Sequence, residues 1–396
     1  MVRLEPGTPA TIRDNNRYLV LQAIERQGPV SRAELSRITQ ISEPTIYSII
    51  DHLASRGLVR EVGVGQSTGG RKPIMIEFNP EAGFVVGVDA GGTNIKMGIS
   101  DLNGRFRHKC KVPTRDLGFG AEAVPGIAGA VRELIAESGV PQEKVLAVGV
   151  AVPGVVDPET GEVSLSPQMG WDKIPLGKLL YEELAIPVVV ENDVNAAALA
   201  EKHWGVGQDM NDFVFIAIGT GIGGGVIING ELYRGYSYAA GEVGYTITDL
   251  SWMKRENSEG FGCLETFAAA QGILKRAIEL WGTRAGGGAA APATVEEVFD
   301  LARAGDEVAK RVVEEVADHL AAGIINISVV LNPQAVVIGG GIANAGDVLL
   351  DPVKERLQRI SPIRPQLLLS KMRADTGLIG AASIACRAAK QNLLSI

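Results

Sequence analysis

Apolar residues near the start of the chain recur with a helical period. Over residues 12–27, the ones that would share a helix face are Leu19, Val20, Ala23 and Ile24. Gly28 and Pro29 are typical residues for the end of such a helix. A short second helix should follow, because Ser31 and Glu34 have the spacing of a capping box.

A third helix is predicted just after the second. Ser42 is suited to cap it, and Pro44 is tolerated in its first turn. Its buried face is marked by apolar residues with i, i+3, i+4, i+7 spacing, which are Ile46, Ile49, Ile50 and Leu53. Two short helices joined by a tight turn, the second of them amphipathic, indicate a helix-turn-helix.

A strand, a glycine-rich loop and a second strand are predicted over residues 58–80, which is the layout of a wing. Its tip holds Arg71 and Lys72 beside two glycines, so Arg71 is placed to enter a narrow minor groove. The amino-terminal end of the third helix would enter the major groove. The residues there that we expect to face DNA are Ser42, Glu43, Pro44, Thr45, Tyr47 and Ser48. A dimerisation or protein-interaction module is the alternative, but the order of helices, wing and basic tip favours DNA.

Apolar strands interrupted by glycines follow this module. Residues 84–100 are predicted to form a strand, a glycine-rich turn and a strand, and residues 213–230 repeat that layout. Such a repeat indicates a duplicated domain with a cleft between its halves. Neither turn is followed by a helix, which excludes a dinucleotide-binding fingerprint, and the sequence contains no P-loop.

The glycine-rich turns are suited to phosphate binding. Glycines let backbone N–H groups approach phosphate oxygens, and Thr93 and Thr220 add hydroxyl donors. Asp89, at the end of its predicted strand, is suited to hold hydrated Mg²⁺. A third glycine cluster, at residues 335–346, is placed to line an adenosine pocket. Each cluster alone is typical of an ordinary turn, but the set, with acidic residues at strand ends, indicates a nucleotide cleft.

An apolar strand that ends in Glu-Asn-Asp runs into an alanine-rich helix over residues 188–201. Asn192 and Asp193 are of the types that cap a helix, and capping is the simpler interpretation. Two phosphate-type loops in the same domain favour a second role. In that role Asp193 is the general base toward a substrate hydroxyl, and Asn192 orients the substrate.

Composition narrows the class of protein. The chain has 396 residues, 46% hydrophobic and 21% charged, with a net charge of −8. It has neither a signal peptide nor an apolar run long enough to span a membrane, and its three cysteines suggest no disulfide framework. We therefore expect a cytoplasmic protein with no membrane partner. Residues 1–80 carry ten Lys or Arg and eight Asp or Glu, so a polyanion should meet this segment rather than the acidic remainder.

These motifs together resemble the ROK family of bacterial repressors and sugar kinases. The resemblance covers nearly the whole chain and rests on SRAELSRITQISEPTI, GGRKP, DAGGT, AVPG, ENDVNAAALAE, GTGIGGG, GEVG, GCLE and IGGG. It implies an α/β protein with a winged helix-turn-helix in front of a two-lobed, actin-like (ribonuclease H-like) sugar-kinase fold. By this resemblance residues 1–80 bind DNA, residues 81–190 with about 376–396 form lobe I, and residues 191–375 form lobe II, which binds sugar and oligomerises.

The resemblance also implies roles for single residues, by position. The implied sugar ligands are Asn192, Asp193, Glu242, Tyr245 and Glu265, with Asp193 similar to the kinase base. The implied nucleotide contacts are Thr93, Asn94, Gly219, Thr220, Gly221, Gly340 and Gly341, with Asp89 as the Mg²⁺ ligand of Mg-ATP.

The chain departs from the family pattern at the family's zinc site. Zinc-containing members have Gly-His where this chain has Gly244-Tyr245, and a CxCGxxGC loop that ends where Cys263 stands. Glu256 and Ser258 take the place of two cysteines, so a tetrahedral N/S site is not expected and neither is zinc. A phenol at position 245 can still hydrogen-bond and stack on a sugar. Gln168 stands where family kinases often have a sugar-binding asparagine.

Two functions follow from the residues and the resemblance. The front module favours a sugar-responsive transcriptional regulator, in particular a repressor of carbohydrate metabolism, with operator DNA and a monosaccharide effector as partners and a homodimer or homotetramer as assembly. The alternative is an ATP-dependent, glucokinase-like sugar kinase, alone or combined with DNA binding, because both glycine turns and Asp193 are retained. No cofactor is obligatory, and Mg-ATP belongs to the kinase alternative. A scaffold that binds neither DNA nor sugar is disfavoured by the number of matched motifs.

Overall fold

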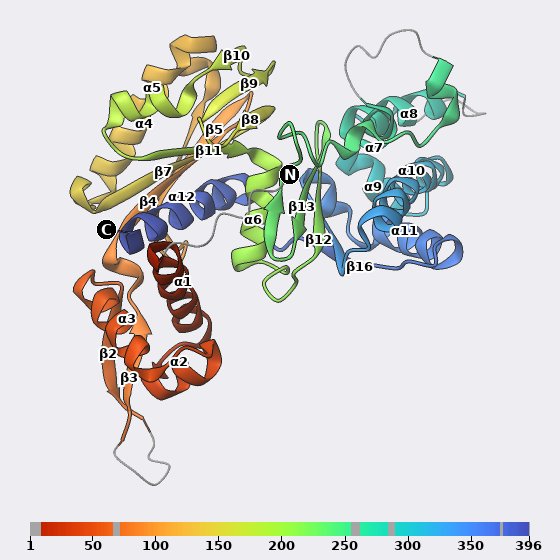
Figure 1. The fold of residues 1–396 in the computed structure, drawn as a ribbon. Coiled ribbons are helices and arrows are strands. Elements are labelled where there is room, and N and C mark those ends of the chain that lie inside the picture. Colours follow the sequence, from red (N-terminus) through yellow and green to blue (C-terminus); the bar gives the residue numbers. More distant parts are fainter. Residues whose placement is uncertain (1–8, 66–71, 255–261, 284–289, 373–374, 396) are drawn as a thin grey trace.

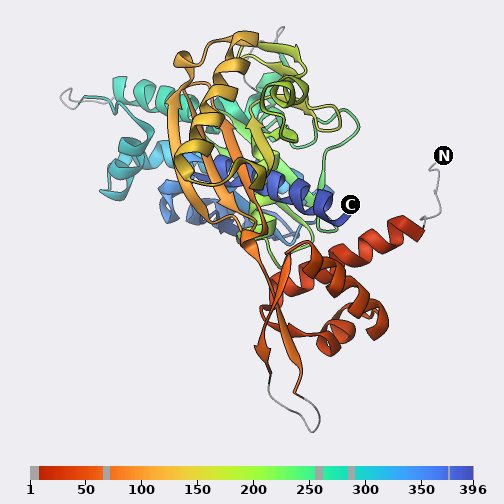
Figure 2. The same cartoon turned by 90° about the vertical axis from the view of Figure 1, so that its left-hand side faces the viewer.

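The computed structural model describes residues 9–65, 72–254, 262–283, 290–372 and 375–395. Its amino-terminal module contains three helices and a small antiparallel sheet of order β1-β3-β2. The elements are α1 (Pro9–Gln27), β1 (Val30–Ser31), α2 (Arg32–Thr39), α3 (Glu43–Ser55), β2 (Val59–Val64) and β3 (Ile74–Phe78). Figure 2 shows this module as a separate body beside the core, with β2 and β3 pointing away from it. The predicted winged helix-turn-helix is therefore confirmed.

The core of this module follows the helical periods of the sequence. All four predicted residues of the α3 face are buried, namely Ile46, Ile49, Ile50 and Leu53. In α1 the prediction was wrong for Leu19, whose side chain is 49% exposed. Leu21 is buried in its place, because the face of α1 that meets the other helices lies further round the helix than the apolar cluster suggested.

The two predicted helix caps of this module differ. Ser31 Oγ accepts a hydrogen bond from Glu34 N at 3.2 Å, as expected of an N-cap, while the Glu34 carboxylate accepts one from Arg37. Ser42 stands at the N-cap position of α3 but makes no side-chain cap. Its hydroxyl lies 2.8 Å from the Thr45 hydroxyl, which corrects the cap that the residue type suggested.

The rest of the chain is built on two five-stranded sheets with the same topology. In each sheet three consecutive strands pair antiparallel, and two later strands add in parallel beside the first of them. The first sheet contains β4 (Phe84–Ala90), β5 (Asn94–Asp101), β6 (Phe106–Pro113), β7 (Val145–Val152) and β11 (Val188–Asn192). The second contains β12 (Phe213–Ile218), β13 (Ile222–Ile228), β14 (Glu231–Tyr233), β15 (Ala335–Gly339) and β16 (Gln366–Leu369). This repeat is the duplication that the glycine turns predicted.

Two helices run between the sheets, α6 (Asp193–Trp204) and α12 (Thr376–Ser395), as Figure 1 shows. Helix α12 packs on β4 and β7, and α6 packs on β12, β13 and α12. The two helices touch closely at Gly380, where an added Cβ would lie 2.7 Å from the backbone of Ala196. The contact between the halves of the duplicated domain is therefore largely a helix–helix contact.

Other helices cover the outer sides. The first sheet carries α4 (Ala123–Ser138), α5 (Leu176–Leu184) and a three-stranded extension of β8 (Val155–Asp157), β9 (Glu162–Ser166) and β10 (Trp171–Ile174). The second carries α7 (Cys263–Ala268), α8 (Ala270–Gly282), α9 (Val295–Arg303), α10 (Glu307–Leu331) and α11 (Asp347–Ile360). No helix among the described residues is long and apolar enough to cross a membrane.

Helix α12 joins the core to the amino-terminal module. Arg17 Nη1 on α1 donates to the carbonyl of Leu394 at 2.8 Å. Lys390 forms an ion pair with Glu25 of α1, at 2.7 Å. The same helix begins at Thr376, beside the end of β4, so it extends from the middle of the core to the winged module (Figure 1).

Candidate functional site

A cavity of about 290 Å³ lies where the two halves of the core meet. Asp89 enters it from the end of β4, and Asp193 from the first turn of α6. The glycine turn after β15 contributes Gly340 and Gly341. The tertiary structure thus brings together four residues that the sequence placed in one site from separate motifs.

Both carboxyl groups of this cavity have raised pKa values. Burial raises the pKa of Asp193 to about 6, and the neighbouring charge of Asp89 acts in the same direction. Hydrogen bonds from backbone N–H groups partly oppose this shift, including one from Val194 N to Asp193 Oδ1 at 2.9 Å. Burial also raises the pKa of Asp89, partly offset by Lys96. A carboxyl group with a pKa near 6 can both accept and return a proton close to neutral pH.

A second cavity, of about 320 Å³, adjoins the first and shares Gly341 and Asn344 with it. Gly219 lies on its wall, and an added Cβ at Gly219 or at Gly341 would find no atom within 4 Å. The glycines therefore leave room for a bulky group such as a nucleotide. Helix α9 supplies residues that the motifs did not indicate, namely Val295, Glu296, Phe299, Asp300 and Arg303. Their only signal in the sequence is that of an ordinary amphipathic helix.

Other predicted nucleotide contacts lie outside the walls of these two cavities. Thr93 and Thr220 are exposed at the tips of their turns, and Asn94 begins β5. Gly221 lies against α7, where an added Cβ would be 2.2 Å from Glu265 Oε1. In the described structure these four residues shape the turns or support Glu265, and their contact with a nucleotide stays a prediction.

The predicted sugar ligands divide into two groups. Glu265 Oε1 accepts from Ile222 N at 2.9 Å and its Oε2 from Gly262 N at 3.1 Å, so backbone donors hold this carboxylate in place. Burial raises the pKa of Glu242, and Glu265 adds to the shift. The charge of Glu242 also contributes to the raised pKa of Asp193, so these two carboxyl groups are close enough to interact. Tyr245 is 55% exposed beside them.

Asn192 is committed to local structure. Its Oδ1 caps α6 by accepting from Val194 N and Asn195 N, at 2.9 and 3.0 Å. Its Nδ2 donates to the carbonyl of Gly154 at 2.9 Å. The simpler interpretation of the sequence, a helix cap, is therefore realised, and a sugar contact would have to come from the remaining amide hydrogen. Gln168 lies against the first glycine turn, since a Cβ added at Gly92 would be 3.3 Å from the Cβ of Gln168.

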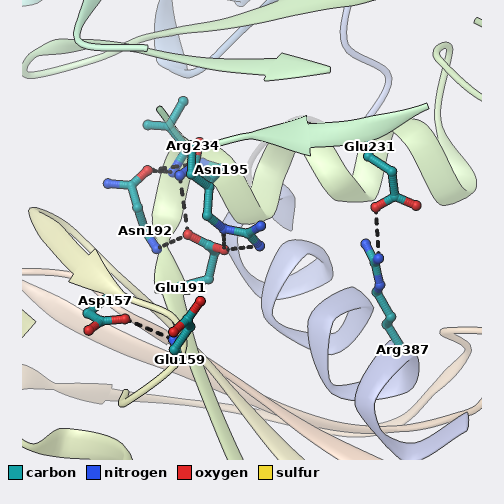
Figure 3. Close-up of polar contacts among 9 residues, drawn as sticks. Asp157, Glu159, Glu191, Asn192, Asn195, Glu231, Arg234 and Arg387 are labelled. Atoms are coloured by element: carbon teal, nitrogen blue, oxygen red, sulfur yellow. Dashed lines mark hydrogen bonds and ion pairs between the residues drawn. The ribbon is translucent and has the colours of Figure 1, made fainter. Parts of the chain in front are cut away.

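The structure adds a pair that sequence reasoning missed. Glu191 is 3% exposed, and its Oε2 accepts from Arg234 Nε at 2.9 Å and from Nη2 at 2.7 Å (Figure 3). Glu191 was visible in the Glu-Asn-Asp motif, but Arg234 lies on the second half of the core. Nothing in the sequence connects the two.

The amino-terminal end of α3 presents the predicted DNA-facing residues to solvent. All six residues from the prediction are exposed, and the ring of Tyr47 is 52% exposed with the guanidinium of Arg32 over it at 5.1 Å. Lys72 is exposed two residues before β3, at the loop end of the wing. Arg71, predicted for the minor groove, lies outside the described residues.

Comparison with known proteins identifies the family. A model described as the ROK family matches residues 85–388. The chain belongs to the ROK family. Among its relatives, the putative xylose repressor of Caldicellulosiruptor sp. (strain Rt8B.4) is 30% identical over 354 residues, which are 88% of each chain. The DNA-binding transcriptional dual regulator NagC of Escherichia coli (strain K12) is 28% identical over 396 residues, covering 98% of this chain and 96% of that protein.

Solved ROK structures agree with the fold of the whole chain. The structure of a ROK family transcriptional regulator, homologous to the Mlc protein of Escherichia coli, covers 97% of this chain and 98% of its own, with a TM-score of 0.84 and 24% identity. A ROK family glucokinase from Streptomyces griseus, in complex with glucose and AMPPNP, covers 77% of this chain and 100% of its own, with a TM-score of 0.62 and 32% identity. The predicted combination of a winged helix-turn-helix with an actin-like fold is confirmed.

The region that corresponds to the zinc site of other ROK proteins is packed by other contacts in this chain. Cys263 is buried, and its Sγ accepts from Thr248 N at 3.3 Å. The Thr248 hydroxyl lies 2.9 Å from His319 Nδ1, and the His319 ring stacks on Phe267 with ring centres 4.1 Å apart. Glu256 and Ser258 lie outside the described residues, and the described ones contain no group of three metal-binding side chains. The expectation of no zinc stays a prediction.

Proposed function

We propose that this ROK protein is a sugar-responsive transcriptional repressor. In this proposal residues 1–80 bind operator DNA through the start of α3 and the wing. The lobe of residues 81–190 with about 376–396 and the lobe of residues 191–375 enclose a monosaccharide between them. The names of its relatives, a putative xylose repressor and a DNA-binding transcriptional dual regulator, support this function. A DNA-binding protein of this kind acts in the cytoplasm and needs no membrane.

The observation that carries the proposal is the placement of α12. Its first residues, Thr376 and Gly377, line the cavity with Asp193, and its last turn contacts α1 of the winged module. A ligand that changes the position of α12 relative to the first sheet would therefore change the orientation of α1. Such a change regulates DNA binding only if the sugar prefers one of the two arrangements.

Two half-sites about one helical turn apart require two copies of the recognition helix. We therefore propose a homodimer or a homotetramer as the active form. Analytical ultracentrifugation would measure the number of chains in the free protein and in its DNA complex. A strictly monomeric protein on a single half-site would contradict this part of the proposal.

The test of the main proposal combines DNA binding with sugar binding. The operator is first selected from a random duplex library, and its affinity is then measured by gel shift with D-xylose, N-acetyl-D-glucosamine and D-glucose. Calorimetry identifies which of the three sugars binds. We expect the sugar that binds to change operator affinity. D-xylose and N-acetyl-D-glucosamine are included because relatives are named putative xylose repressor and N-acetylglucosamine repressor. Binding of a sugar without any change in operator affinity would refute sugar control.

A sugar kinase is the second candidate, and one observation favours it. Asp193, with its pKa raised to about 6, lies next to a cavity that has the room for a nucleotide. In this function Asp89 would hold the Mg²⁺ of Mg-ATP, the glycines at 219 and 341 would face the nucleotide, and Asp193 would accept the proton of the sugar hydroxyl. A coupled ADP-release assay with D-glucose should detect the activity. Equal rates for the unmodified chain and Asp193→Asn would exclude Asp193 as the base.

A further inference from the structure

One buried carboxylate divides its hydrogen bonds between two walls of the candidate sugar site. Glu191 Oε1 accepts from Asn192 N at 3.1 Å and from Asn195 Nδ2 at 3.2 Å. The first donor is the N-cap residue of α6, and the second belongs to the first turn of α6, which also carries Asp193. Glu191 Oε2 accepts both of its hydrogen bonds from Arg234 (Figure 3). Each oxygen of Glu191 therefore holds a different segment.

Arg234 lies at the start of the segment that carries Glu242. It follows β14 directly, and its carbonyl accepts from Ala240 N at 3.0 Å, which folds residues 234–240 into a compact turn. The carbonyl of Gly241 then accepts from Gly224 N at 2.7 Å and ties the end of the turn to β13. Movement of Arg234 relative to α6 would therefore move Glu242 relative to Asp193.

The Glu191–Arg234 pair depends on charge balance. Glu191 is almost fully buried, and a buried carboxylate is costly unless a cation and hydrogen-bond donors accompany it. Arg234 supplies that cation, with two N–H groups directed at one oxygen. Without Arg234 the carboxylate would be buried without its counter-ion and would turn away, and this change disturbs its bonds to the start of α6.

We propose that Arg234 is a positioning residue for the sugar site. Through Glu191 it sets the distance between the first turn of α6, with Asn192 and Asp193, and the segment that carries Glu242. This inference rests on the proposed sugar binding at that place. Arg234 itself acts through Glu191 and is not one of the predicted sugar ligands.

A second approach of the same segment to the first half of the core supports the proposal. Tyr238 has φ of 60°, a backbone conformation that aromatic residues rarely adopt. Desolvation, and then the charge of Asp157 at the end of β8, raise the pKa of its hydroxyl. The turn after Arg234 thus lies near the first half of the core at Tyr238 as well as at Arg234, although it belongs to the second half.

The chain contains a matched control for Arg234. Glu231, on β14 just before Arg234, accepts from Arg387 of α12 at 2.7 Å, and Figure 3 shows this pair apart from Glu191. It also joins the second half of the core to an element packed on the first sheet. It does not touch Glu191 or the start of α6. Loss of this pair removes one interlobe ion pair but should leave the sugar site in place.

The experiment compares Arg234→Gln, Arg234→Lys and Glu231→Gln with the unmodified chain. Calorimetry with D-xylose, N-acetyl-D-glucosamine and D-glucose measures sugar affinity. We expect Arg234→Gln to weaken binding at least about tenfold, Glu231→Gln to change it less than about twofold, and Arg234→Lys to restore part of the loss because it keeps the charge. Equal weakening by Arg234→Gln and Glu231→Gln, or no gain from Arg234→Lys over Arg234→Gln, would overturn the proposal.

Hydrogen exchange gives a readout that is independent of the sugar. In Arg234→Gln the backbone amides of Val194 and Asn195 should exchange faster, and in Glu231→Gln they should not. If the unmodified chain binds none of the three sugars, the proposed function fails on this panel, whereas unchanged amide exchange in Arg234→Gln refutes the positioning role. If Arg234→Gln does not fold, the double variant Glu191→Gln/Arg234→Gln carries the test, because it buries no unpaired charge. Sugar binding by the double variant as tight as by the unmodified chain would overturn the inference.

Discussion

Replacement of Asp193 by asparagine should change the pH dependence of stability in a defined way. The asparagine keeps the oxygen that accepts from Val194 N at 2.9 Å and removes only the titrating group. In the folded chain the pKa of Asp193 is about 6, against an ordinary value of 3.8. The protonated carboxyl therefore stabilises the fold, and this contribution is complete below pH 3.8 and lost as the pH rises through 6.

The size of the effect follows from the two pKa values. A difference of about two units corresponds to about 3 kcal/mol over the full range of pH, as an upper value for a half-buried group. At pH 5 Asp193 is already ionised in the unfolded chain, so only about 1.4 kcal/mol of this stabilisation is left to be lost between pH 5 and pH 7.5. Relative to Asp193→Asn, the unmodified chain should lose this amount of stability over that interval.

Urea denaturation of both proteins at several pH values between 5 and 7.5 measures the difference. From pH 5 to pH 7.5 the free energy of unfolding of the variant should rise by about 1.4 kcal/mol relative to that of the unmodified chain. Curves that stay parallel over this interval would show that Asp193 titrates at its ordinary pKa. The raised pKa, and with it the role of Asp193 as a base near neutral pH, would then be refuted.

Three further predictions concern the winged module and its contact with the core. Tyr47→Ala should lower operator affinity by about 1 kcal/mol or more without changing the thermal midpoint, because the ring is exposed. Leu53→Ala should instead destabilise the module by about 2–5 kcal/mol, because that side chain is buried. Gel shift measures the first effect and calorimetry the second, and an equal loss of stability in both variants would contradict the assignment of Tyr47 to the DNA-facing surface. Lys72→Gln should reduce the slope of log affinity against log salt by about one, measured by fluorescence anisotropy, and an unchanged slope would remove Lys72 from the phosphate contacts. His203 lies near the end of α6, and its Nδ1 is 2.6 Å from Ser383 Oγ of α12. Burial, and then Arg387 and Lys390, lower the pKa of His203 to about 3, so its ring should stay neutral from pH 8 to pH 5 in an NMR titration, and a midpoint within that range would contradict the structure.

Local pattern in the sequence was enough to predict the elements and the family. The buried face of α3 follows from apolar spacing, since helix geometry alone decides which side chains share a face. The repeated strand-turn-strand pattern predicted the duplication, and the glycines and acidic residues at strand ends predicted one cleft. Asp89, Asp193, Gly340 and Gly341 do meet there. These features depend on residues close together in the chain, or on motifs whose order is itself informative.

Contacts between residues far apart in the chain required the tertiary structure. Leu19 looked like a core residue, but the orientation of α1 in the module leaves it exposed. The α9 residues on the second cavity have no motif, because an amphipathic helix can turn its polar edge toward a ligand or toward solvent. Glu191 and Arg234 are 43 positions apart, and only the packing of the two halves of the core makes one the counter-ion of the other. Periodicity and motif spacing carry no information about such a pair, since a Glu and an Arg at these positions could equally well be exposed to solvent.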